Sequence, residues 1–282
     1  MSEAPLLTLR NLRVVYPGDE GDVHAVRNVS FTLGRERLGI VGESGSGKST
    51  TGRAIIGLVP APGLVTAEVM RLGDTDLLKL SERGFRRLRG KHIAMVLQDP
   101  KYSLDPVMSV GHQIAETHRC HFGSSMKKAR MAALEMLEAV RIRDPERVYA
   151  LYPHQVSGGM GQRVMIAMML IADPDLLIAD EPTSALDVGV QEQVLAIMDD
   201  LVRRRGMGLI LISHNLHLVS SFCDRVLVMY AGRVVETCMT GALAEARHPY
   251  TRGLLASLPE LGRRRAELPQ LQRDPAWAEE AL

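Results

Sequence analysis

Apolar residues along this chain gather in short runs that predict buried strands. Four continuous runs cover residues 38–41, 93–97, 176–179 and 209–212. Runs of this length are typical of parallel strands that are covered on both faces of a sheet. Residues 6–16 and 26–33 mix apolar and polar positions and predict two further strands, with the loop Pro17-Gly18-Asp19 between them.

The middle of the chain changes to a helical pattern. From about residue 107 to residue 169 apolar positions recur at near-helical spacing, as in the series Met131, Leu134, Leu137 and Val140. This spacing places apolar side chains on one face of a helix. A helix-rich segment inserted between two strand-bearing halves indicates a protein with two lobes.

The end of the chain predicts a hairpin and then a tail. Residues 225–230 and 233–236 are expected to form two strands joined by Ala231-Gly232. After Ser257 prolines and an arginine triplet appear without any sustained period. We therefore expect residues 1–258 to form the functional domain and residues 259–282 to form a C-terminal tail that docks weakly or not at all.

The composition argues against a nucleic-acid-binding, membrane-spanning or secreted protein. The 282 residues are 46% hydrophobic and include 34 basic and 33 acidic side chains, which gives a formal net charge of +1. A protein whose main partner is a nucleic-acid backbone normally needs a strong basic excess, so no nucleic-acid partner is expected. The sequence has no run of 18 apolar residues, no secretion signal and no CxxC spacing among its three cysteines. These features predict a soluble protein of the reducing cytosol.

A glycine-rich loop is the first candidate site. Residues 42–49 read Gly-Glu-Ser-Gly-Ser-Gly-Lys-Ser and fit the pattern G-x-x-x-x-G-K-[ST] between a predicted strand and a predicted helix. The glycines let successive backbone N–H groups point at an anion, and the N-terminus of the helix adds partial positive charge. Lys48 is expected to reach the β- and γ-phosphates, and the Ser49 hydroxyl to coordinate Mg²⁺. The loop therefore predicts binding of a nucleoside triphosphate.

Two consecutive carboxylates form the second candidate site. Asp180 and Glu181 directly follow the apolar run 176–179. Ligands of open α/β sheets bind at the carboxyl ends of the strands. Asp180 is suited to hold Mg²⁺ through water, and Glu181 to polarise the attacking water as a general base. Together with the glycine-rich loop, the pair predicts hydrolysis of the triphosphate.

A third motif lies between these two sites. The segment Val156-Ser157-Gly158-Gly159-Met160 opens the last part of the helical region. Here the sequence resembles the ATP-binding cassette (ABC) ATPases, whose signature is Leu-Ser-Gly-Gly-Gln. Val156 and Met160 depart from that consensus, whereas the serine and both glycines match it. Because the motif begins a helix, it forms a second helix end that can bind an anion.

Other motifs of this family follow in the expected order over roughly residues 6–258. The resemblance implies that Tyr16 stacks on adenine and that Gln98 belongs to the glutamine loop. It also implies that His214 senses the γ-phosphate and orients the water near Glu181. The catalytic residues are then Glu181, His214 and Gln98, and the Mg²⁺ ligands are Ser49, Gln98 and Asp180. The residues assigned to ATP are Tyr16, Gly42, Glu43, Ser44, Gly45, Ser46, Gly47, Lys48, Ser49, Thr50, Ser157, Gly158 and Gly159.

The resemblance also implies a fold and an assembly. The fold is that of an α/β P-loop NTPase (ABC ATPase) with a RecA-like core, an N-terminal antiparallel β subdomain and a helical subdomain inserted at about residues 100–170. Two chains are expected to stack head to tail, so that the Ser157 loop of one covers the γ-phosphate held by Lys48 of the other. Hydrolysis would remove that bridging anion and loosen the pair.

Within the family, the sequence is most similar to ATPase subunits of dipeptide and oligopeptide importers and of their nickel-importing relatives. The segments that resemble them are residues 42–50, 152–155, 178–183, 228–232 and 248–251. The implied partners are two transmembrane permease subunits, a second ABC ATPase chain and, indirectly, a substrate-binding protein. Residues 98–152 would contact the permeases at the cytoplasmic face of the cell inner membrane. Such importers commonly pair two different ATPase chains, which favours a heterodimer over a homodimer.

Several alternatives remain open. Asn215 stands where Asp is common, Gly161 replaces a common Arg, and no cysteine follows Cys238, whereas many peptide-importer ATPases carry a cysteine-rich extension. A nickel, metallophore or opine-type importer is therefore an alternative. A soluble ABC ATPase acting on ribosomes or DNA is a second, although the chain has one cassette and no sustained heptads. The third is a cassette that binds ATP without hydrolysing it, which the presence of Glu181 and His214 disfavours. The transported substrate is not encoded in these motifs.

Overall fold

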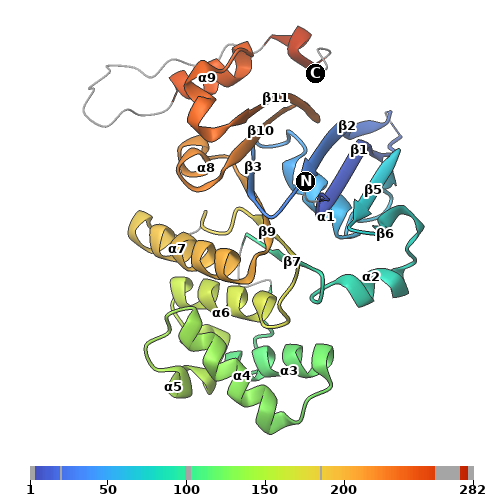
Figure 1. The fold of residues 1–282 in the computed structure, drawn as a ribbon. Coiled ribbons are helices and arrows are strands. Elements are labelled where there is room, and N and C mark those ends of the chain that lie inside the picture. The colour runs from blue at the N-terminus through green and yellow to red at the C-terminus, as the bar shows by residue number, and fades with distance from the viewer. Residues whose placement is uncertain (1–3, 20, 99–102, 185, 258–273, 279–282) are drawn as a thin grey trace. The chain divides into compact units, whose positions relative to one another are not determined.

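The chain passes from one structural unit into a second and back again. The structure, a computed structural model, describes residues 4–19, 21–98, 103–184, 186–257 and 274–278 (Figure 1). The first unit contains residues up to Glu82 and from Ile210 onward, and the second contains Arg83–Leu209. Among the described residues, no helix has both the length and the apolar character needed to cross a bilayer.

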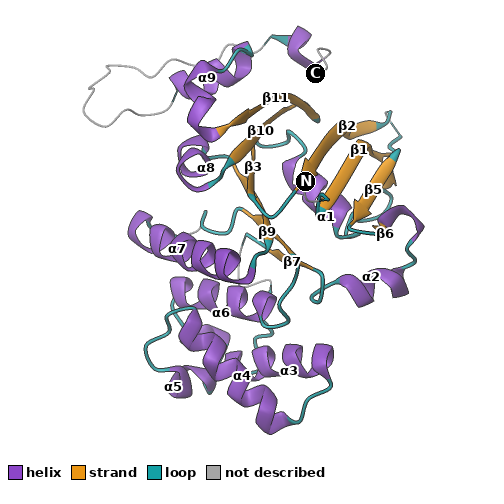
Figure 2. Cartoon of the chain, in the orientation of Figure 1, coloured by secondary structure: helices purple, strands orange, loops and turns teal. Residues whose placement is uncertain are grey.

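An antiparallel sheet forms the N-terminal part of the first unit. Its strands are β1 (Leu7–Tyr16), β2 (Val23–Leu33), β4 (Leu64–Thr66), β5 (Val69–Leu72) and β6 (Thr75–Asp76). The order is β2-β1-β5-β6, and β4 also pairs with β1 (Figure 2). Leu7, Leu9, Leu12 and Val14 of β1 are all buried, so the sheet presents an apolar face to the core.

A second group of strands in the first unit delivers the glycine-rich loop. β3 (Arg37–Val41) runs parallel to β10 (Arg225–Tyr230), which forms an antiparallel hairpin with β11 (Arg233–Met239). A bidentate ion pair fixes the start of this group, because the Arg37 guanidinium donates to both carboxylate oxygens of Asp224 at 2.5 and 3.1 Å. The helices are α1 (Lys48–Ile55), α8 (Leu216–Phe222) and α9 (Pro249–Ala256), with short 3-10 turns at Leu77–Lys79 and Thr240–Glu245.

The described part of the C-terminal tail is in contact with the first unit. A single 3-10 turn, Pro275–Ala278, carries Trp277. The indole lies 5.9, 6.0 and 6.1 Å from the rings of Tyr230, His248 and Tyr250, measured between ring centroids. Trp277 therefore packs against these three rings, whereas the expected weak docking of residues 259–282, most of which lie outside the described residues, stays a prediction.

The second unit consists of two parallel strands and a set of helices. β7 (Ile93–Val96) pairs with β8 (Leu176–Asp180), and β9 (Gly208–Ser213) leads out of the unit. The helices are α2 (Glu82–Leu88), α3 (Val110–Phe122), α4 (Met126–Ala139), α5 (Pro145–Tyr149), α6 (Gly158–Leu170) and α7 (Val188–Arg205), with a 3-10 turn at Pro153–Gln155. α3, α4 and α6 pack against one another, and α6 also packs against β7 and α7.

The predicted elements agree with the structure where the apolar signal is strong. The strands expected at 6–16, 38–41, 93–97, 176–179 and 209–212, the helical middle and the late hairpin are confirmed. The short strands β4 to β6 and the helices α7 to α9 lie outside the predicted elements. α7 packs through Val194, Leu195, Ile197 and Met198 of the apolar run 194–198, a signal that the sequence does contain. Its polar face carries the i,i+4 ion pairs Asp199–Arg203 and Asp200–Arg204.

The cysteines should differ sharply in reactivity. Burial raises the pKa of the Cys223 thiol to about 12, whereas Cys120 is exposed. The thiolate is the reactive form, so at pH 8 a maleimide is expected to modify Cys120 rapidly and Cys223 only after unfolding. Peptide mass spectrometry after brief labelling tests this expectation. Equal labelling of both cysteines in the folded protein would contradict it.

Candidate nucleotide and hydrolysis site

The glycine-rich loop occupies the turn between β3 and α1 in the first unit. Gly47 is the N-cap of α1 with φ of 94°, and Gly45 has φ of 81°, both in the region that side chains with a Cβ avoid. A Cβ at Gly47 would lie 2.4 Å from the Ala25 carbonyl oxygen. A residue with a side chain would therefore fit neither the backbone conformation nor the space at this position. The loop can curl over the N-terminus of α1 only because glycine stands there.

The ammonium group of Lys48 is held inside this loop. It donates hydrogen bonds to the carbonyl oxygens of Gly42 and Glu43, both at 2.7 Å, and lies 3.4 Å from the Ser46 hydroxyl. The Lys48 residue is only 6% exposed, so these groups replace water around the charge. A fixed positive charge beside the N-terminus of a helix is the arrangement that binds a phosphate.

Two distant segments hold the loop from outside. The Gly232 N–H, in the β10–β11 turn, donates to the Ser46 carbonyl oxygen at 3.1 Å. The Glu43 N–H donates to the Tyr250 hydroxyl at 3.0 Å. The sequence predicts no role for Tyr250 in the loop, because 207 positions separate it from Glu43 and only the fold brings the two residues into contact.

Tyr16 and His214, the other predicted nucleotide residues of the first unit, lie at strand ends. Tyr16 ends β1, and its ring lies against Gly63, where an added Cβ would come within 2.7 Å of the ring. His214 is exposed and directly follows β9. The next residue, Asn215, caps α8 by accepting a hydrogen bond from the Leu218 N–H at 3.1 Å. Asn and Asp are equally good N-caps, so this departure from the family pattern preserves the local structure.

The second unit brings Gln98 and Glu181 together. β8 ends at Asp180, which is 5% exposed, and Glu181 follows it. The Gln98 amide donates to the Glu181 carboxylate at 3.5 Å. Glu181 has φ of 47°, an uncommon conformation for a residue other than glycine, and such backbone conformations concentrate at functional sites. The geometry turns the carboxylate away from the strand direction and places it beside an amide that can orient it.

The serine-glycine motif begins helix α6, as predicted. Ser157 is the N-cap, and its hydroxyl accepts a hydrogen bond from the Met160 N–H at 3.4 Å. A Cβ at Gly159 would lie 2.7 Å from a methyl carbon of Val190, whereas Gly158 is exposed with 4.0 Å of space. The cap uses only the backbone of Met160, so the departure from Gln at this position leaves the helix start intact. The exposed N–H groups of the first turn can accept an anion.

The histidines of α3 are engaged in packing. The His118 ring nitrogen lies 2.8 Å from the Ser124 hydroxyl, and burial lowers the pKa of His118, with a smaller contribution from Lys128. The His121 ring faces Gly90, where a Cβ would come within 2.3 Å of it. Within the described residues, no three His, Cys, Asp or Glu side chains are grouped to hold a metal ion.

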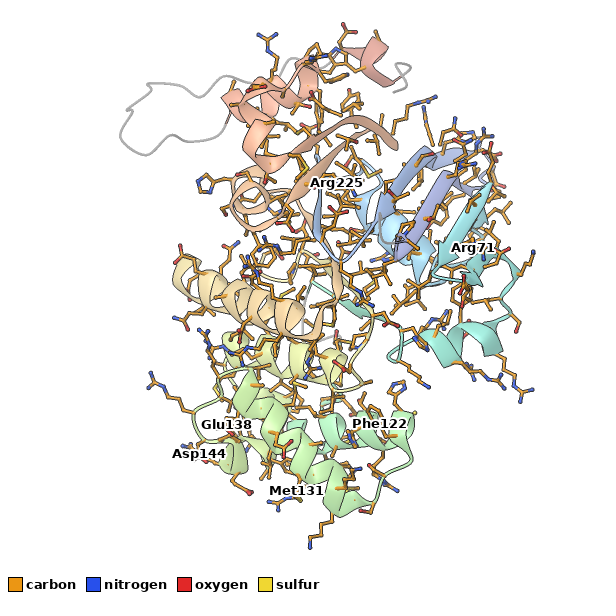
Figure 3. All side chains as sticks on the ribbon, viewed as in Figure 1. Arg71, Phe122, Met131, Glu138, Asp144 and Arg225 are labelled. Atoms are coloured by element: carbon orange, nitrogen blue, oxygen red, sulfur yellow. The ribbon has the colours of Figure 1, made fainter. Side chains whose placement is uncertain are left out.

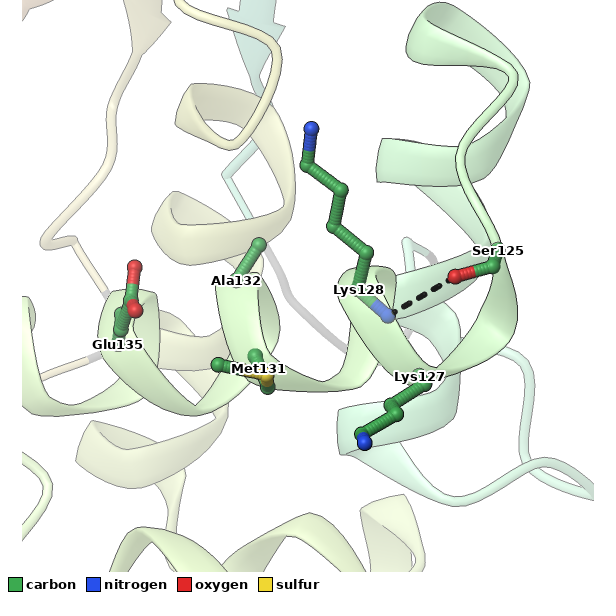
Figure 4. A pocket seen from close by; sticks show the side chains of 6 residues that line it. All are labelled: Ser125, Lys127, Lys128, Met131, Ala132 and Glu135. Carbon is green, nitrogen blue, oxygen red and sulfur yellow. Dashed lines mark hydrogen bonds between the residues drawn. The ribbon is translucent and has the colours of Figure 1, made fainter.

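Exposed apolar side chains mark the surface of α3 and α4. Phe122 is 54% exposed and Met131 is 55% exposed (Figure 3). A hollow of about 330 Å³ adjoins Met131 on α4, where the Ser125 hydroxyl caps the helix (Figure 4). The residues that line it are Ser125, Lys127, Lys128, Met131, Ala132 and Glu135. An apolar patch rimmed by charged residues is a common feature of protein-binding surfaces.

Comparison with known proteins gives a consistent result. Residues 26–184 match the family described as ABC transporter. The chain is 46% identical over 269 residues to the dipeptide transport ATP-binding protein DppD of Haemophilus influenzae, covering 95% of this chain and 82% of that protein. It is 49% identical to the probable peptide ABC transporter ATP-binding protein y4tR of Sinorhizobium fredii, with 94% and 81% covered.

A solved structure supports the fold independently. The dimeric post-hydrolysis state of the ATP-binding cassette MJ0796, bound to ADP and Pi, superposes with a TM-score of 0.72 at 27% identity. The match covers 83% of this chain and 98% of that one. The predicted α/β P-loop fold is therefore confirmed.

Gly45 and Gly47, two of the three positive-φ glycines of the loop, allow a matched stability test. Gly45→Ala is expected to cost about 1–2 kcal/mol, because it adds only backbone strain in open space. Gly47→Ala is expected to cost at least about 1 kcal/mol more, because the Ala25 carbonyl must also move. Urea unfolding of both variants measures the difference. Equal losses of stability would show that the contact with Ala25 does not confine the loop.

Proposed function

This chain belongs to the ABC transporter family, and we propose that it is the subunit that hydrolyses ATP to power the uptake of peptides by a bacterial importer. The observation that carries the proposal is near full-length identity of 46–49% to two ATP-binding proteins named for dipeptide or peptide transport. Both names favour peptides over the nickel alternative. The ATP-binding and hydrolytic motifs all lie among the described residues of this one chain.

We assign ATP binding to the glycine-rich loop and Tyr16. The phosphates are bound by the N–H groups of residues 42–50 and by Lys48, whose ammonium exchanges part of its contact with the Gly42 and Glu43 carbonyls for phosphate oxygens. The half-buried Tyr16 ring, supported by Gly63, provides a surface on which adenine stacks.

Hydrolysis is assigned to the residues at the end of β8. Glu181 takes the proton of the attacking water, and Gln98 holds the carboxylate through its amide. His214 orients the water toward the γ-phosphate. Such a base contributes typically 10²–10⁴-fold to the rate.

The proposed Mg²⁺ ligands fit that ion by their chemistry. Ser49, Gln98 and Asp180 offer hydroxyl, amide and carboxylate oxygens, and Mg²⁺ binds oxygen ligands and keeps several waters. Asp180 is nearly buried and is the last residue of β8, and ligands of open α/β sheets bind at the carboxyl ends of the strands. When bound, the ion would neutralise charge on the β- and γ-phosphates.

The partners are proposed from the surfaces of the second unit. The exposed helix start at Ser157 would cover the γ-phosphate bound to a second ABC ATPase chain, and we favour a different chain over a second copy. The exposed side chains of Phe122 on α3 and Met131 on α4 would contact the cytoplasmic side of the two permease subunits, with the chain held peripherally at the inner membrane. A substrate-binding protein would deliver the peptide to the permeases.

Substitution of Glu181 tests the hydrolytic assignment. Glu181→Gln should retain ATP binding while turnover falls by roughly 10²–10⁴-fold, because the amide cannot accept the proton of water. Release of phosphate and equilibrium binding of ATP are the measurements. Glu192→Gln, the same change at an exposed position of α7, is the control and should leave both unchanged. Normal turnover by Glu181→Gln would refute the general-base assignment.

Substitution of Lys48 tests the binding assignment separately. Lys48→Ala removes the ammonium that the loop carbonyls hold, so affinity for ATP should fall by at least about tenfold, the loss expected of a charge-assisted hydrogen bond. Binding of a fluorescent ATP analogue, compared with Lys127→Ala on α4, provides the measurement. ATP affinity within twofold of that control would place the nucleotide elsewhere.

A further inference from the structure

A continuous series of hydrogen bonds links β11 to the glycine-rich loop. The Glu236 carboxylate of β11 accepts from the Arg247 N–H at 2.6 Å and from the His248 N–H at 3.4 Å. His248 in turn caps α9, since its Nδ1 accepts from the Tyr250 N–H at 3.1 Å. The Tyr250 hydroxyl then accepts from the Glu43 N–H at 3.0 Å. The first residues of α9 are therefore held from two sides, by Glu236 of β11 and by Glu43 of the glycine-rich loop.

Tyr250 is well placed to hold a backbone group in position. It is among the largest fully buried side chains described, at 0% exposure. Its ring packs on Tyr230 with 4.7 Å between centroids and lies 6.1 Å from Trp277. A ring confined on several sides cannot follow a moving loop, so the position of its hydroxyl is set by the core rather than by Glu43.

The Glu43 residue that Tyr250 contacts also holds Lys48, the lysine assigned to phosphate binding. Its carbonyl oxygen accepts from the Lys48 ammonium at 2.7 Å and from the Ser46 N–H at 3.2 Å. The same residue thus connects Tyr250 on one side with the phosphate-binding lysine on the other. Loss of the Tyr250 hydroxyl would remove an acceptor of the Glu43 N–H inside the protein.

We propose that Tyr250 is a positioning residue for ATP, which holds the first peptide of the phosphate-binding loop and so keeps Lys48 oriented for the phosphates. The proposal rests on the proposed function and extends it to the segment His248-Pro249-Tyr250, which belongs neither to the glycine-rich loop nor to the hydrolytic residues. Tyr250 acts through Glu43 and does not touch the nucleotide. Its contribution therefore belongs to ATP affinity rather than to the chemical step.

The test compares two neighbouring tyrosines of the same aromatic cluster, of which only Tyr250 makes a hydroxyl contact with the loop within the described residues. Tyr250→Phe removes the acceptor and keeps the ring, whereas the Tyr230 hydroxyl has no hydrogen-bond partner among the described residues, so Tyr230→Phe is the matched control. The full chain is titrated with a non-hydrolysable ATP analogue, and kcat and KM are measured with ATP. Emission of Trp277, the single tryptophan of the sequence, reports whether the aromatic cluster remains packed.

The expected result is a split between binding and chemistry. Tyr250→Phe should weaken the affinity for the analogue roughly three- to tenfold and raise KM similarly, the scale of one lost hydrogen bond, with kcat within twofold of wild type. Tyr230→Phe should leave both affinity and kcat unchanged, and Trp277 emission should match wild type in both variants. All assays are run at a temperature where circular dichroism shows each variant fully folded.

Either of two results would overturn the proposal. Affinity reduced less than threefold in Tyr250→Phe would show that the hydroxyl does not position the loop. A fall in kcat larger than the loss of affinity would show that it acts on the chemical step instead. Failure of the wild-type chain to bind ATP, or of its assembly with the second ATPase chain and the permeases to hydrolyse it, would refute the proposed function, which distinguishes that outcome from failure of this inference.

Discussion

A lysine ammonium that is nearly excluded from water needs protein groups to solvate it. Lys48 obtains them from the Gly42 and Glu43 carbonyls, which can reach it only if the backbone turns back over the N-terminus of α1. That turn requires glycine at position 47, where φ is 94° and the Ala25 carbonyl fills the adjacent space. The burial of one charged side chain is thus coupled to the local backbone conformation and to glycine at position 47.

Much of the first unit serves to hold this loop. β3 delivers it, the β10–β11 turn binds Ser46 through Gly232, and α9 binds Glu43 through Tyr250. The last two contacts come from sequence positions about two hundred residues after the loop. Such support raises the affinity of a site for a highly charged ligand, because donors that are already fixed lose little entropy when the phosphate binds.

The sequence predicted the structure correctly where a local pattern of residues determines it. The apolar runs predicted the buried strands, and the motif around Lys48 predicted the loop, its helix and the family to which the chain belongs. Tyr250 and Trp277 were beyond reach, because their roles depend on contacts between distant segments. Glu181 was assigned to the hydrolytic site from its position after a predicted strand, and Gln98 from the family resemblance. Their hydrogen bond joins positions 83 apart and could be seen only in the fold. The domain boundaries and the roles assigned to the site residues stay predictions.

Amide hydrogen exchange over residues 42–50 of the full chain tests the central claim most directly. The segment is followed without nucleotide, with ATP and with adenosine, at concentrations that saturate binding. If the loop uses its backbone N–H groups to bind phosphate, ATP should slow exchange in this segment strongly and adenosine should not. Exchange that ATP leaves unchanged, under conditions where ATP is bound, would contradict the account.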